Sequence, residues 1–572
     1  MDHDMSTGSK IDELERAALS GRIGRRDFLA RLLALGVSAS SASLLAMHAE
    51  AANRNQAAQR AALRDEYDYI IVGAGSSGCI LANRISASGA SVLLVEAGGA
   101  DIDQPKIAQA QLWQQNLFSD TDWGRTSIPE PGLGNRRQAA SGGKIWGGSG
   151  SINAMIWLRG DVRDYLHWAE QVGPEWNLPA LHRAYLRLAT PLPNARPLRS
   201  PAGTGPITFG RYAPQHPLTP AYLAAGREFG LGEIELNAGG LLDGIGVAEV
   251  NATADGRRSG PAQAYLVPVL TRSNLTVLSD TLVTRLELQG DRCHGINAIV
   301  DGVPKKITAT RQTILCAGAF ESPKLLMLSG VGCADQLAPL GIPLLHEMPH
   351  VGKNLQDHIL LLNILFKSQA ALPPPISNGA SAFAYFSNRS RLWAPDVQVM
   401  CLQSPFLTNA LPVGAGFSIA PFLAKPRSRG TAKLVSADPR KALRIDPRYL
   451  QERVDQDNMI LGLERAIDIG NSRALKPFSA GLSTPSVLNT RSEKLAFIAQ
   501  NGGAGFHYVS TCSAGGSPDN SVVDARFRVW GVERLMVVDA SVIPEVTAVN
   551  THVATMMLAE LAAEQLGMAP QV

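Results

Sequence analysis

A glycine-rich stretch constrains the fold of this chain more than any other feature. Residues 67–99 read YDYIIVGAGSSGCILANRISASGASVLLVEAGG. The apolar run 69–72 predicts a short strand, and the glycines of 73–78 predict a tight turn that opens a helix ending near Ser86. A second apolar strand is expected at 91–95. Strand, turn, helix and strand in this order make a βαβ unit, so we expect a parallel sheet with helices packed on it.

The three glycines of the turn have separate physical tasks. Gly73 allows the tight turn, Gly75 lets a pyrophosphate approach the backbone, and Gly78 lets helix and strand pack closely. Ser76 and Ser77 lie in the first helical turn, where free N–H groups and the helix dipole favour an anion. The pattern predicts a dinucleotide-binding site, but it does not separate FAD from NAD.

An acidic residue stands at the end of the second predicted strand. Glu96, followed by Ala97, comes 23 residues after Gly73 and is placed to accept hydrogen bonds from a ribose diol. A carboxylate at this position favours an unphosphorylated adenosine ribose over a 2′-phosphate.

Length and composition exclude several classes of protein. The 572 residues are too many for one simple core and suggest two lobes or more. Lys and Arg number 53 against 50 Asp and Glu, with no long basic run, so nucleic acid is not expected as a partner. The six cysteines show no CxxC and no metal-ligand spacing, so we expect neither a metal site nor a disulfide framework.

The N-terminal segment resembles an export signal. Residues 21–52 read GRIGRRDFLARLLALGVSASSASLLAMHAEAA, with the adjacent pair Arg25 and Arg26 ahead of a weakly apolar stretch. Ala49-Glu50-Ala51 then forms a small-x-small cleavage pattern. This arrangement is similar to a twin-arginine signal with a cut near Ala51, and it predicts a periplasmic or secreted protein.

On this interpretation residues 1–51 are the signal peptide and 52–66 a polar linker. The alternative is an amphipathic N-terminal helix. A stable membrane span is not expected, because Arg31 and a cluster of serines interrupt the apolar run.

Two further loops carry a family resemblance. GGKIWGGSGSINAMIWLRGDVRDYLHWAE (142–170) and CAGAFESPKLLMLSGVG (316–332) resemble the glucose–methanol–choline oxidoreductase family, whose two signature patterns fall at 143–160 and 318–332. The resemblance continues, in family order, through 121–138, 257–278, 350–358 (HVGKNLQDH), 425–450 and 522–560. It covers nearly everything from Tyr67 to Leu566.

The resemblance implies an α/β fold, in which a Rossmann-like FAD-binding domain is interleaved with a substrate domain built on an antiparallel sheet. Because of that second domain, the chain as a whole is expected to be α+β. The FAD-binding domain is expected at 67–160, 245–358 and 505–566. The substrate-binding domain is expected at 161–244 and 359–504.

The resemblance also implies the contacts of the cofactor. The residues that match the family's FAD contacts are Gly73, Gly75, Ser76, Ser77, Gly78, Glu96 and Ala97 at the AMP half, Gly147, Gly148 and Asn153 along the pyrophosphate and isoalloxazine, Val283 at the adenine, and Asp539 and Ala540 at the ribityl chain. Some members tether FAD through a histidine just before the asparagine of the second loop. Ile152 stands at that position here, so noncovalent FAD is expected.

One histidine is the candidate base for alcohol oxidation. Removing the hydroxyl proton near neutral pH needs a base within hydrogen-bond reach, and imidazole meets that need best. In the family the base lies in an H-x-x-G-T-C loop, which His507 matches in HYVSTC. Tyr508 replaces the proline that commonly follows the histidine, and Ser510 replaces the loop's glycine. These changes remove no group that the chemistry needs, but they leave the loop geometry open.

A second polar group must orient the alcohol oxygen and share its developing charge. Asn550 matches the family position for it, in the loop after VVDAS-x-x-P. His552, two residues on, either faces the pocket as a second imidazole or points away, and Asn550 is favoured over it.

The sequence therefore predicts an exported enzyme that oxidises a small-molecule alcohol with FAD. Its electron acceptor is O2 or a quinone or cytochrome, with a dehydrogenase slightly favoured over an oxidase. The alternatives are a lyase of the same fold, of the hydroxynitrile lyase type, and a non-catalytic flavin-fold protein. A choline-type substrate would need a carboxylate and an aromatic cage for its cation, and no sequence feature establishes one.

Overall fold

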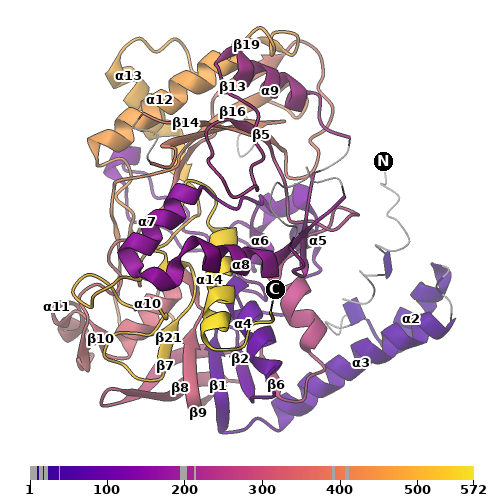
Figure 1. The fold of residues 1–572 in the computed structure, drawn as a ribbon, viewed down its shortest axis with the longest axis vertical. Helices are drawn as coiled ribbons and strands as arrows, with labels where there is room; N and C mark the ends of the chain where they lie inside the picture. The colour runs from indigo at the N-terminus through magenta and orange to yellow at the C-terminus, as the bar shows by residue number, and fades with distance from the viewer. Residues whose placement is uncertain are drawn as a thin grey trace.

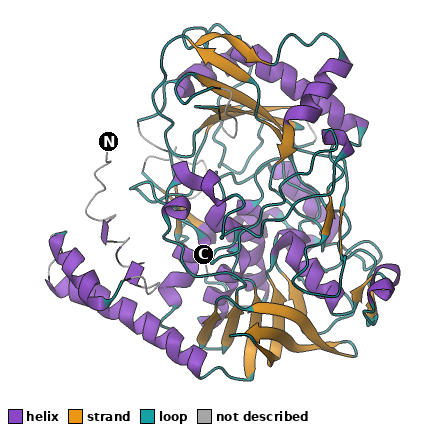
Figure 2. Ribbon diagram, turned by 180° about the vertical axis from the view of Figure 1, so that it is seen from behind, coloured by secondary structure: helices purple, strands orange, loops and turns teal. Residues whose placement is uncertain are grey.

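Two β-sheets organise the molecule. The computed structural model describes residues 10–11, 14, 17–18, 23–35, 37, 39–193, 203–211, 214–388, 393–405 and 411–571. A seven-stranded sheet lies at one end of the molecule and an eight-stranded sheet at the other, with helices and long loops between them (Figures 1 and 2).

The seven-stranded sheet has the order β6-β2-β1-β9-β8-β7, with β21 paired to β9. Its strands are β1 (Glu66–Val72), β2 (Val92–Val95), β6 (Leu275–Leu278), β7 (Leu282–Gln289), β8 (Arg292–Val300), β9 (Val303–Leu315) and β21 (Leu535–Val537). Strands β6, β2, β1 and β9 run parallel, and so does β21, whereas β7, β8 and β9 form an antiparallel meander. The predicted strand–helix–strand unit is confirmed, with α4 (Ser76–Ser86) between β1 and β2.

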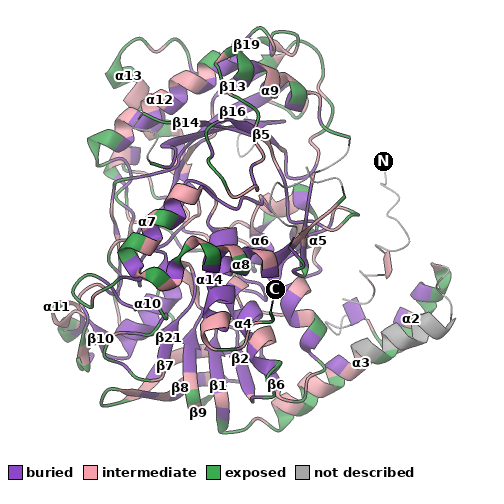
Figure 3. Ribbon diagram, in the orientation of Figure 1, coloured by how far each residue is buried: buried purple, intermediate pink, exposed green. Residues whose placement is uncertain are grey.

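Helix α14 (His552–Gln565) packs beside α4, although the two are far apart in the sequence (Figure 1). Arg84 of α4 donates hydrogen bonds from Nη2 to Glu560 Oε1 at 2.7 Å and from Nε at 3.1 Å. The hydroxyl of Tyr265 donates to the same carboxylate oxygen at 2.9 Å. Most of α14 is buried, as Figure 3 shows, so the C-terminal helix is part of the core of this lobe.

The eight-stranded sheet has the order β19-β13-β16-β15-β14-β5, and β12 joins β16 to β20. Its strands are β5 (Ile245–Val247), β12 (Ile359–Leu361), β13 (Leu365–Ser368), β14 (Ala380–Phe386), β15 (Val397–Leu402), β16 (Gly416–Leu423), β19 (Ser479–Thr484) and β20 (Gly502–Ala504). Helices α9 (Leu218–Glu228) and α12 (Arg453–Gly470) pack on one face, and α13 (Arg491–Asn501) packs on α12. The expected boundary at 245 assigned β5 to the FAD-binding domain, but β5 pairs with β14 in this second sheet.

The remaining elements connect the two sheets. The helices are α5 (Pro105–Ala108), α6 (Ser149–Ile152), α7 (Val162–Val172), α8 (Leu178–Leu188), α10 (Gly318–Leu328) and α11 (Ala334–Leu337). The short helical turns are η1 (Ala110–Asn116), η2 (Pro131–Leu133), η3 (Pro174–Trp176), η4 (Ala262–Leu266), η5 (Val267–Val269), η6 (Ala338–Leu340) and η7 (Ala540–Val542). Three two-stranded sheets pair β3 (Ala189–Pro191) with β4 (Ile207–Phe209), β10 (Val331–Gly332) with β11 (His346–Glu347), and β17 (Thr431–Lys433) with β18 (Arg444–Asp446).

Helices α2 (Arg25–Ala34) and α3 (Ala39–Ala61) precede the first sheet, and part of the expected signal segment lies outside the described residues. Residues 52–61, expected as a linker, continue α3 rather than forming an irregular segment. Gln56 of α3 donates to the carbonyls of Leu270 and Leu275 and accepts from the N–H of Val277 at 3.0 Å, so α3 covers the edge strand β6. Across the described chain, no helix combines the length and the apolar character needed to cross a membrane.

Candidate active site

A single cavity between the two lobes brings the predicted site residues together. Its lining includes Gly73, Gly75, Ser76, Ser77, Glu96, Ala97, Gly148, Asn153, Val283, Asp539, Ala540, His507, Asn550 and His552. Gly78 and Gly147 are the two predicted residues that lie behind the wall rather than on it. Residues separated by almost 500 positions thus meet at one site.

The first glycine turn has the geometry expected of a phosphate cradle. Gly73 has a φ of +100°, and a side chain there would lie 2.5 Å from the carbonyl oxygen of Cys316. A side chain at Gly78 would lie 1.9 Å from the carbonyl oxygen of Gly73, so α4 can pack on the turn only with glycine at this position. At Gly75 the nearest atom would be 3.6 Å away, which leaves this backbone open to the cavity.

The second glycine loop packs directly on the first. The N–H of Gly147 donates to the carbonyl of Ala74 at 2.7 Å. Gly148 has a φ of +53°, and a side chain there would meet Gly75 Cα at 2.8 Å. Two loops that the sequence separates by about seventy residues therefore form one continuous backbone surface, and α6 begins immediately after it.

Glu96 lines the cavity and hydrogen-bonds to the backbone of the first glycine turn. Its carboxylate accepts hydrogen bonds from the backbone N–H groups of Ala74 at 2.9 Å and Gly98 at 2.8 Å. Burial raises the pKa of Glu96 to about 7, and these hydrogen bonds oppose that shift. A carboxylate has about four lone-pair positions, so acceptor capacity remains for a ribose hydroxyl.

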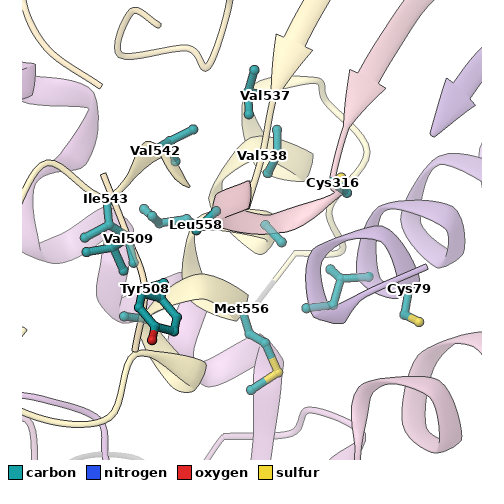
Figure 4. Close-up of a cluster of buried hydrophobic side chains, with 14 of the residues drawn as sticks. Cys79, Cys316, Tyr508, Val509, Val537, Val538, Val542, Ile543, Met556 and Leu558 are labelled. Carbon is teal, nitrogen blue, oxygen red and sulfur yellow. The ribbon is translucent and has the colours of Figure 1, made fainter. Parts of the chain in front are cut away.

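Asp539, a second cavity-lining carboxylate, binds backbone N–H groups of two separate segments. Its carboxylate accepts from the backbone N–H groups of Gly318 at 2.9 Å and Ser541 at 2.8 Å, and from the hydroxyl of Ser322. These bonds join the segment after β21, which includes Ala540, to the first turn of α10. Figure 4 shows the apolar layer that supports this region, with Val537 and the neighbouring side chains of the β21 segment packed together.

Three buried polar atoms on the cavity wall lack a partner among the described residues, Trp113 Nε1 and two atoms at helix starts. The Ser77 hydroxyl, in the first turn of α4, and His552 Nε2, in the first turn of α14, make no hydrogen bond within the described residues. Buried polar groups are rarely left unsatisfied, so both atoms point to a polar ligand at these helix starts. An extended dinucleotide with a pyrophosphate, over two glycine loops and a ribose-binding carboxylate, fits this donor set.

The imidazole of His507 lies between two hydrogen-bond partners. Its Nε2 is 2.9 Å from the amide nitrogen of Asn550, and its Nδ1 is 2.9 Å from Nδ1 of His358. The predicted pair of His507 and Asn550 is therefore in direct contact on the cavity wall. Burial lowers the pKa of His507 to about 3, so the ring is neutral at physiological pH.

The loop around His507 is held from behind by a buried carboxylate. Asp357 accepts from the backbone N–H of His507 at 2.6 Å and from that of Gly505 at 3.1 Å. Burial raises the pKa of Asp357 to about 7. Ser510, which replaces the family's glycine, has a φ of +74°, in the left-handed region that glycine favours. Its hydroxyl donates to the carbonyl of Ile543 at 2.6 Å, so the serine fixes the turn by a side-chain bond.

The contacts of His358 determine which nitrogen of His507 carries the proton. His358 Nε2 is 2.9 Å from each of two backbone carbonyls, those of Ala424 and Thr547, which only accept. Nε2 of His358 therefore carries the proton, and because burial lowers the pKa of this ring, its Nδ1 has a free lone pair. His507 then donates from Nδ1–H, and its Nε2 presents a lone pair toward Asn550 and the cavity.

The same reasoning applies to His552, for which the sequence left two orientations open. Oδ1 of Asn153 accepts from the N–H of Met155 at 2.9 Å and from Arg258 Nη1 at 2.7 Å, so the amide nitrogen of Asn153 donates to His552 Nδ1 at 3.2 Å. Burial, with the nearby Arg258, lowers the pKa of His552 to about 3. Its Nε2 is then protonated and can only donate. His552 faces the cavity, but as a hydrogen-bond donor and not as a second base.

Sequence reasoning assigned no role to several site residues. His358 and Asp357 lie in HVGKNLQDH, which supported the family resemblance, but nothing in that string reveals which residue contacts His507. The apolar wall contributed by β15, around Met400 and Leu402, was also missed. Apolar alternation marks a strand, but it does not say which face of the strand lines a cavity.

Comparisons with known proteins agree with this architecture. The N-terminal and C-terminal family models of GMC oxidoreductases match residues 67–360 and 426–559. The mitochondrial choline dehydrogenase of Mus musculus is 34% identical over 543 residues, 88% of this chain and 89% of the relative. Pyridoxine 4-oxidase of Microbacterium luteolum is 33% identical over 506 residues, 86% and 98% of the two chains.

Solved structures share the fold. The crystal structure of pyridoxine 4-oxidase from Mesorbium loti superposes with a TM-score of 0.83 and 31% identity, over 88% of this chain and all of that one. A formate oxidase from Aspergillus oryzae, studied for its FAD modification, has a TM-score of 0.80 at 24% identity, over 88% and 98% of the two chains. The predicted fold class and cofactor are confirmed, and the chain belongs to the GMC oxidoreductase family of FAD-dependent enzymes.

Proposed function

We propose that this protein oxidises the CH–OH group of a small-molecule alcohol to a carbonyl. The observation that carries the proposal is the position of His507 Nε2, 2.9 Å from the amide nitrogen of Asn550 on the wall of the FAD-binding cavity, with the other ring nitrogen bonded to His358. A base and a hydrogen-bond donor side by side are what an alcohol hydroxyl requires.

In the proposed reaction His507 Nε2 takes the hydroxyl proton. The amide of Asn550 donates to the alcohol oxygen and stabilises the negative charge that develops on it. That charge raises the proton affinity of the buried imidazole, which is otherwise kept neutral. FAD supplies the hydride acceptor when it is bound. His358 keeps the second ring nitrogen of His507 occupied as a donor, so only Nε2 is available for the proton.

We also propose that FAD is held without a covalent bond. Ile152 is buried in α6 and lines the cavity, and its side chain has no nucleophilic atom. Acid precipitation of the holoprotein should leave the yellow colour in the supernatant, and colour retained by the pellet would contradict this.

The export of the protein and its electron acceptor are proposed from the sequence. Arg25 and Arg26 support a twin-arginine route to the periplasm, and that location favours a dehydrogenase with a quinone or cytochrome as acceptor. Replacing both arginines by lysine should keep the protein in the cytoplasmic fraction. Equal periplasmic recovery of the double variant and the wild type would refute the route.

The decisive test of the function is anaerobic mixing of the holoenzyme with a panel of alcohols while the flavin absorbance is followed. Bleaching by at least one alcohol is expected. His507→Ala should lower the rate by about 10²-fold or more, because a positioned general base contributes about that much. Turnover without net bleaching would instead indicate a lyase. Running dye acceptors and O2 side by side then separates dehydrogenase from oxidase.

A further inference from the structure

We propose that the substrate is an uncharged alcohol with an apolar body, and that the site discriminates against alcohols carrying a quaternary ammonium group. This inference rests on the proposed function and names its substrate class. It separates this protein from the relatives named for choline.

The part of the cavity nearest His507 has an apolar wall contributed largely by the second lobe. That wall is formed by Ile156, Leu360, Leu362, Met400, Leu402 and Phe422. The ring of Phe422 lies 5.4 Å from that of His507, so the wall stands next to the proposed base. Met400 and Leu402 belong to a small apolar cluster on the cavity-facing side of β15. Val399 and Cys401, which alternate with them along the strand, pack in the main core. A substrate body beside His507 would therefore contact mainly hydrocarbon.

The carboxylates that line the cavity lie on the cofactor side and are already engaged. Glu96 and Asp539 each accept hydrogen bonds from backbone N–H groups. Glu321 is paired with Arg125 at 2.9 Å and with Lys324 at 3.0 Å, which together lower its pKa despite burial. Two cations and one carboxylate give this cluster a net positive charge, which repels a cationic substrate.

Among the described residues, no Asp or Glu lines the apolar wall. Asp357 lies behind the loop, bonded to the backbone of His507, and does not reach the cavity surface. The internal segments outside the description, 194–202, 212–213, 389–392 and 406–410, contain no Asp or Glu in the sequence. The amide of Asn378, a polar group on this wall, is committed to the carbonyl of Ala154 at 2.6 Å.

An ammonium ion loses its hydration on entering such a site. Aromatic rings line this cavity, with Phe422, Phe506 and Tyr508 close to His507, but without a carboxylate on the wall they do not replace that hydration. A neutral alcohol of the same shape loses little hydration and gains the apolar contact. Choline and 3,3-dimethylbutan-1-ol are such a pair, because a carbon atom replaces the charged nitrogen. We expect kcat/KM to favour the carbon analogue by about 10²-fold or more.

The test mixes the wild-type holoenzyme anaerobically with each of the two alcohols. Flavin bleaching gives kcat/KM, and a static perturbation of the flavin spectrum gives Kd when no bleaching occurs. A preference of at least tenfold for 3,3-dimethylbutan-1-ol in either readout supports the inference. Equal or better use of choline overturns the inference, and bleaching in that experiment still supports alcohol oxidation. Tight binding of the carbon analogue without bleaching by any panel alcohol contradicts the proposed function and supports only the discrimination of the site against a quaternary ammonium group. Binding of neither alcohol overturns the inference.

A variant pair isolates charge from shape. Met400→Glu places a carboxylate on the apolar wall, and Met400→Gln is the neutral control of similar size. The glutamate variant should shift the choline preference by about tenfold or more relative to the glutamine variant, with equal flavin content in both. Equal preferences in the two folded variants would show that charge does not determine the selection.

Discussion

Replacing His358 with glutamine should slow alcohol oxidation while leaving FAD bound. The native ring spans two sets of partners, the carbonyls of Ala424 and Thr547 at Nε2 and His507 at Nδ1. A glutamine amide reaches the position of Nε2, so it preserves the bonds to the two carbonyls. It places no acceptor at the position of Nδ1, so the Nδ1–H of His507 loses its partner.

The size of the effect follows from that lost acceptor. A buried donor left without a partner costs about 1–3 kcal/mol. The ring of His507 avoids this cost by moving its proton to Nε2, while the amide of Asn550 turns to present its oxygen. In that tautomer Nε2 cannot accept the hydroxyl proton. At about 1.4 kcal/mol per tenfold, the fraction of His507 in the active tautomer should fall roughly 5- to 150-fold.

The matched control is His358→Asn. Its shorter side chain places an oxygen near the position of Nδ1, which restores the acceptor for His507 and gives up the bonds to the two carbonyls. We expect this variant to be less stable but close to wild type in the rate of flavin bleaching under anaerobic conditions. The ¹⁵N chemical shifts of the histidine ring should report His507 protonated at Nδ1 in the wild type and the asparagine variant, and at Nε2 in the glutamine variant.

Two results would refute this reasoning. One is a glutamine variant that bleaches as fast as wild type. The other is an asparagine variant that is fully loaded with flavin and as slow as the glutamine variant, because a merely structural role of His358 would affect both.

Three further predictions concern the cofactor loops and pH. Gly78→Ala should lower Tm sharply, because its Cβ would lie 1.9 Å from the Gly73 carbonyl oxygen. Gly75→Ala should keep the Tm of the apoprotein but weaken FAD binding. Equal Tm losses of the two variants, measured by calorimetry, would contradict these separate roles of the two glycines. Glu96→Gln should weaken FAD affinity about tenfold or more in titrations of the apoprotein, because one of the two backbone N–H groups loses its acceptor, and unchanged affinity would remove Glu96 from the site. The folded pKa of His507, about 3, lies below the unfolded value of about 6.5, so the unfolded chain binds more protons between these values and stability is lost as pH falls below 6.5. Between pH 7 and 5 the wild type should lose about 2 kcal/mol more of its unfolding free energy than His507→Gln, and identical pH profiles would show that the ring is not buried in its neutral form.

The features that could be predicted from the sequence are those fixed by short-range backbone demands. Gly73 is required by its positive φ and Gly78 by its contact with the Gly73 carbonyl inside one βαβ unit, so their spacing was sufficient to place the turn, the helix and Glu96. The fold class, the family and FAD are confirmed on that basis together with the resemblance. The catalytic roles of His507 and Asn550 stay predictions, and the structure places the two side chains in direct contact.

What the sequence could not provide depends on contacts between distant segments. The proton position on His507 follows from two carbonyls, in the 424 and 547 regions, that meet one ring of the 350–358 segment. The direction of His552 follows from Asn153 and Arg258, which lie hundreds of residues earlier. The expected boundary at 245 placed β5 in the FAD-binding domain, whereas β5 pairs with β14, and its three residues carry no signal for that partner.

The contact between α4 and α14 has a consequence for the order of events during synthesis. Arg84 leaves the ribosome hundreds of residues before Glu560, its partner, and Asn550 and His552 are made equally late. The first glycine turn therefore exists for most of translation without the helix that completes its lobe and without either member of the proposed catalytic pair, His507 and Asn550. Such long-range closure is slow and leaves apolar strands exposed in the meantime. We therefore expect insertion of FAD to be a late step, because a nascent chain that lacks residues 552–565 lacks the helix that packs beside the first glycine turn.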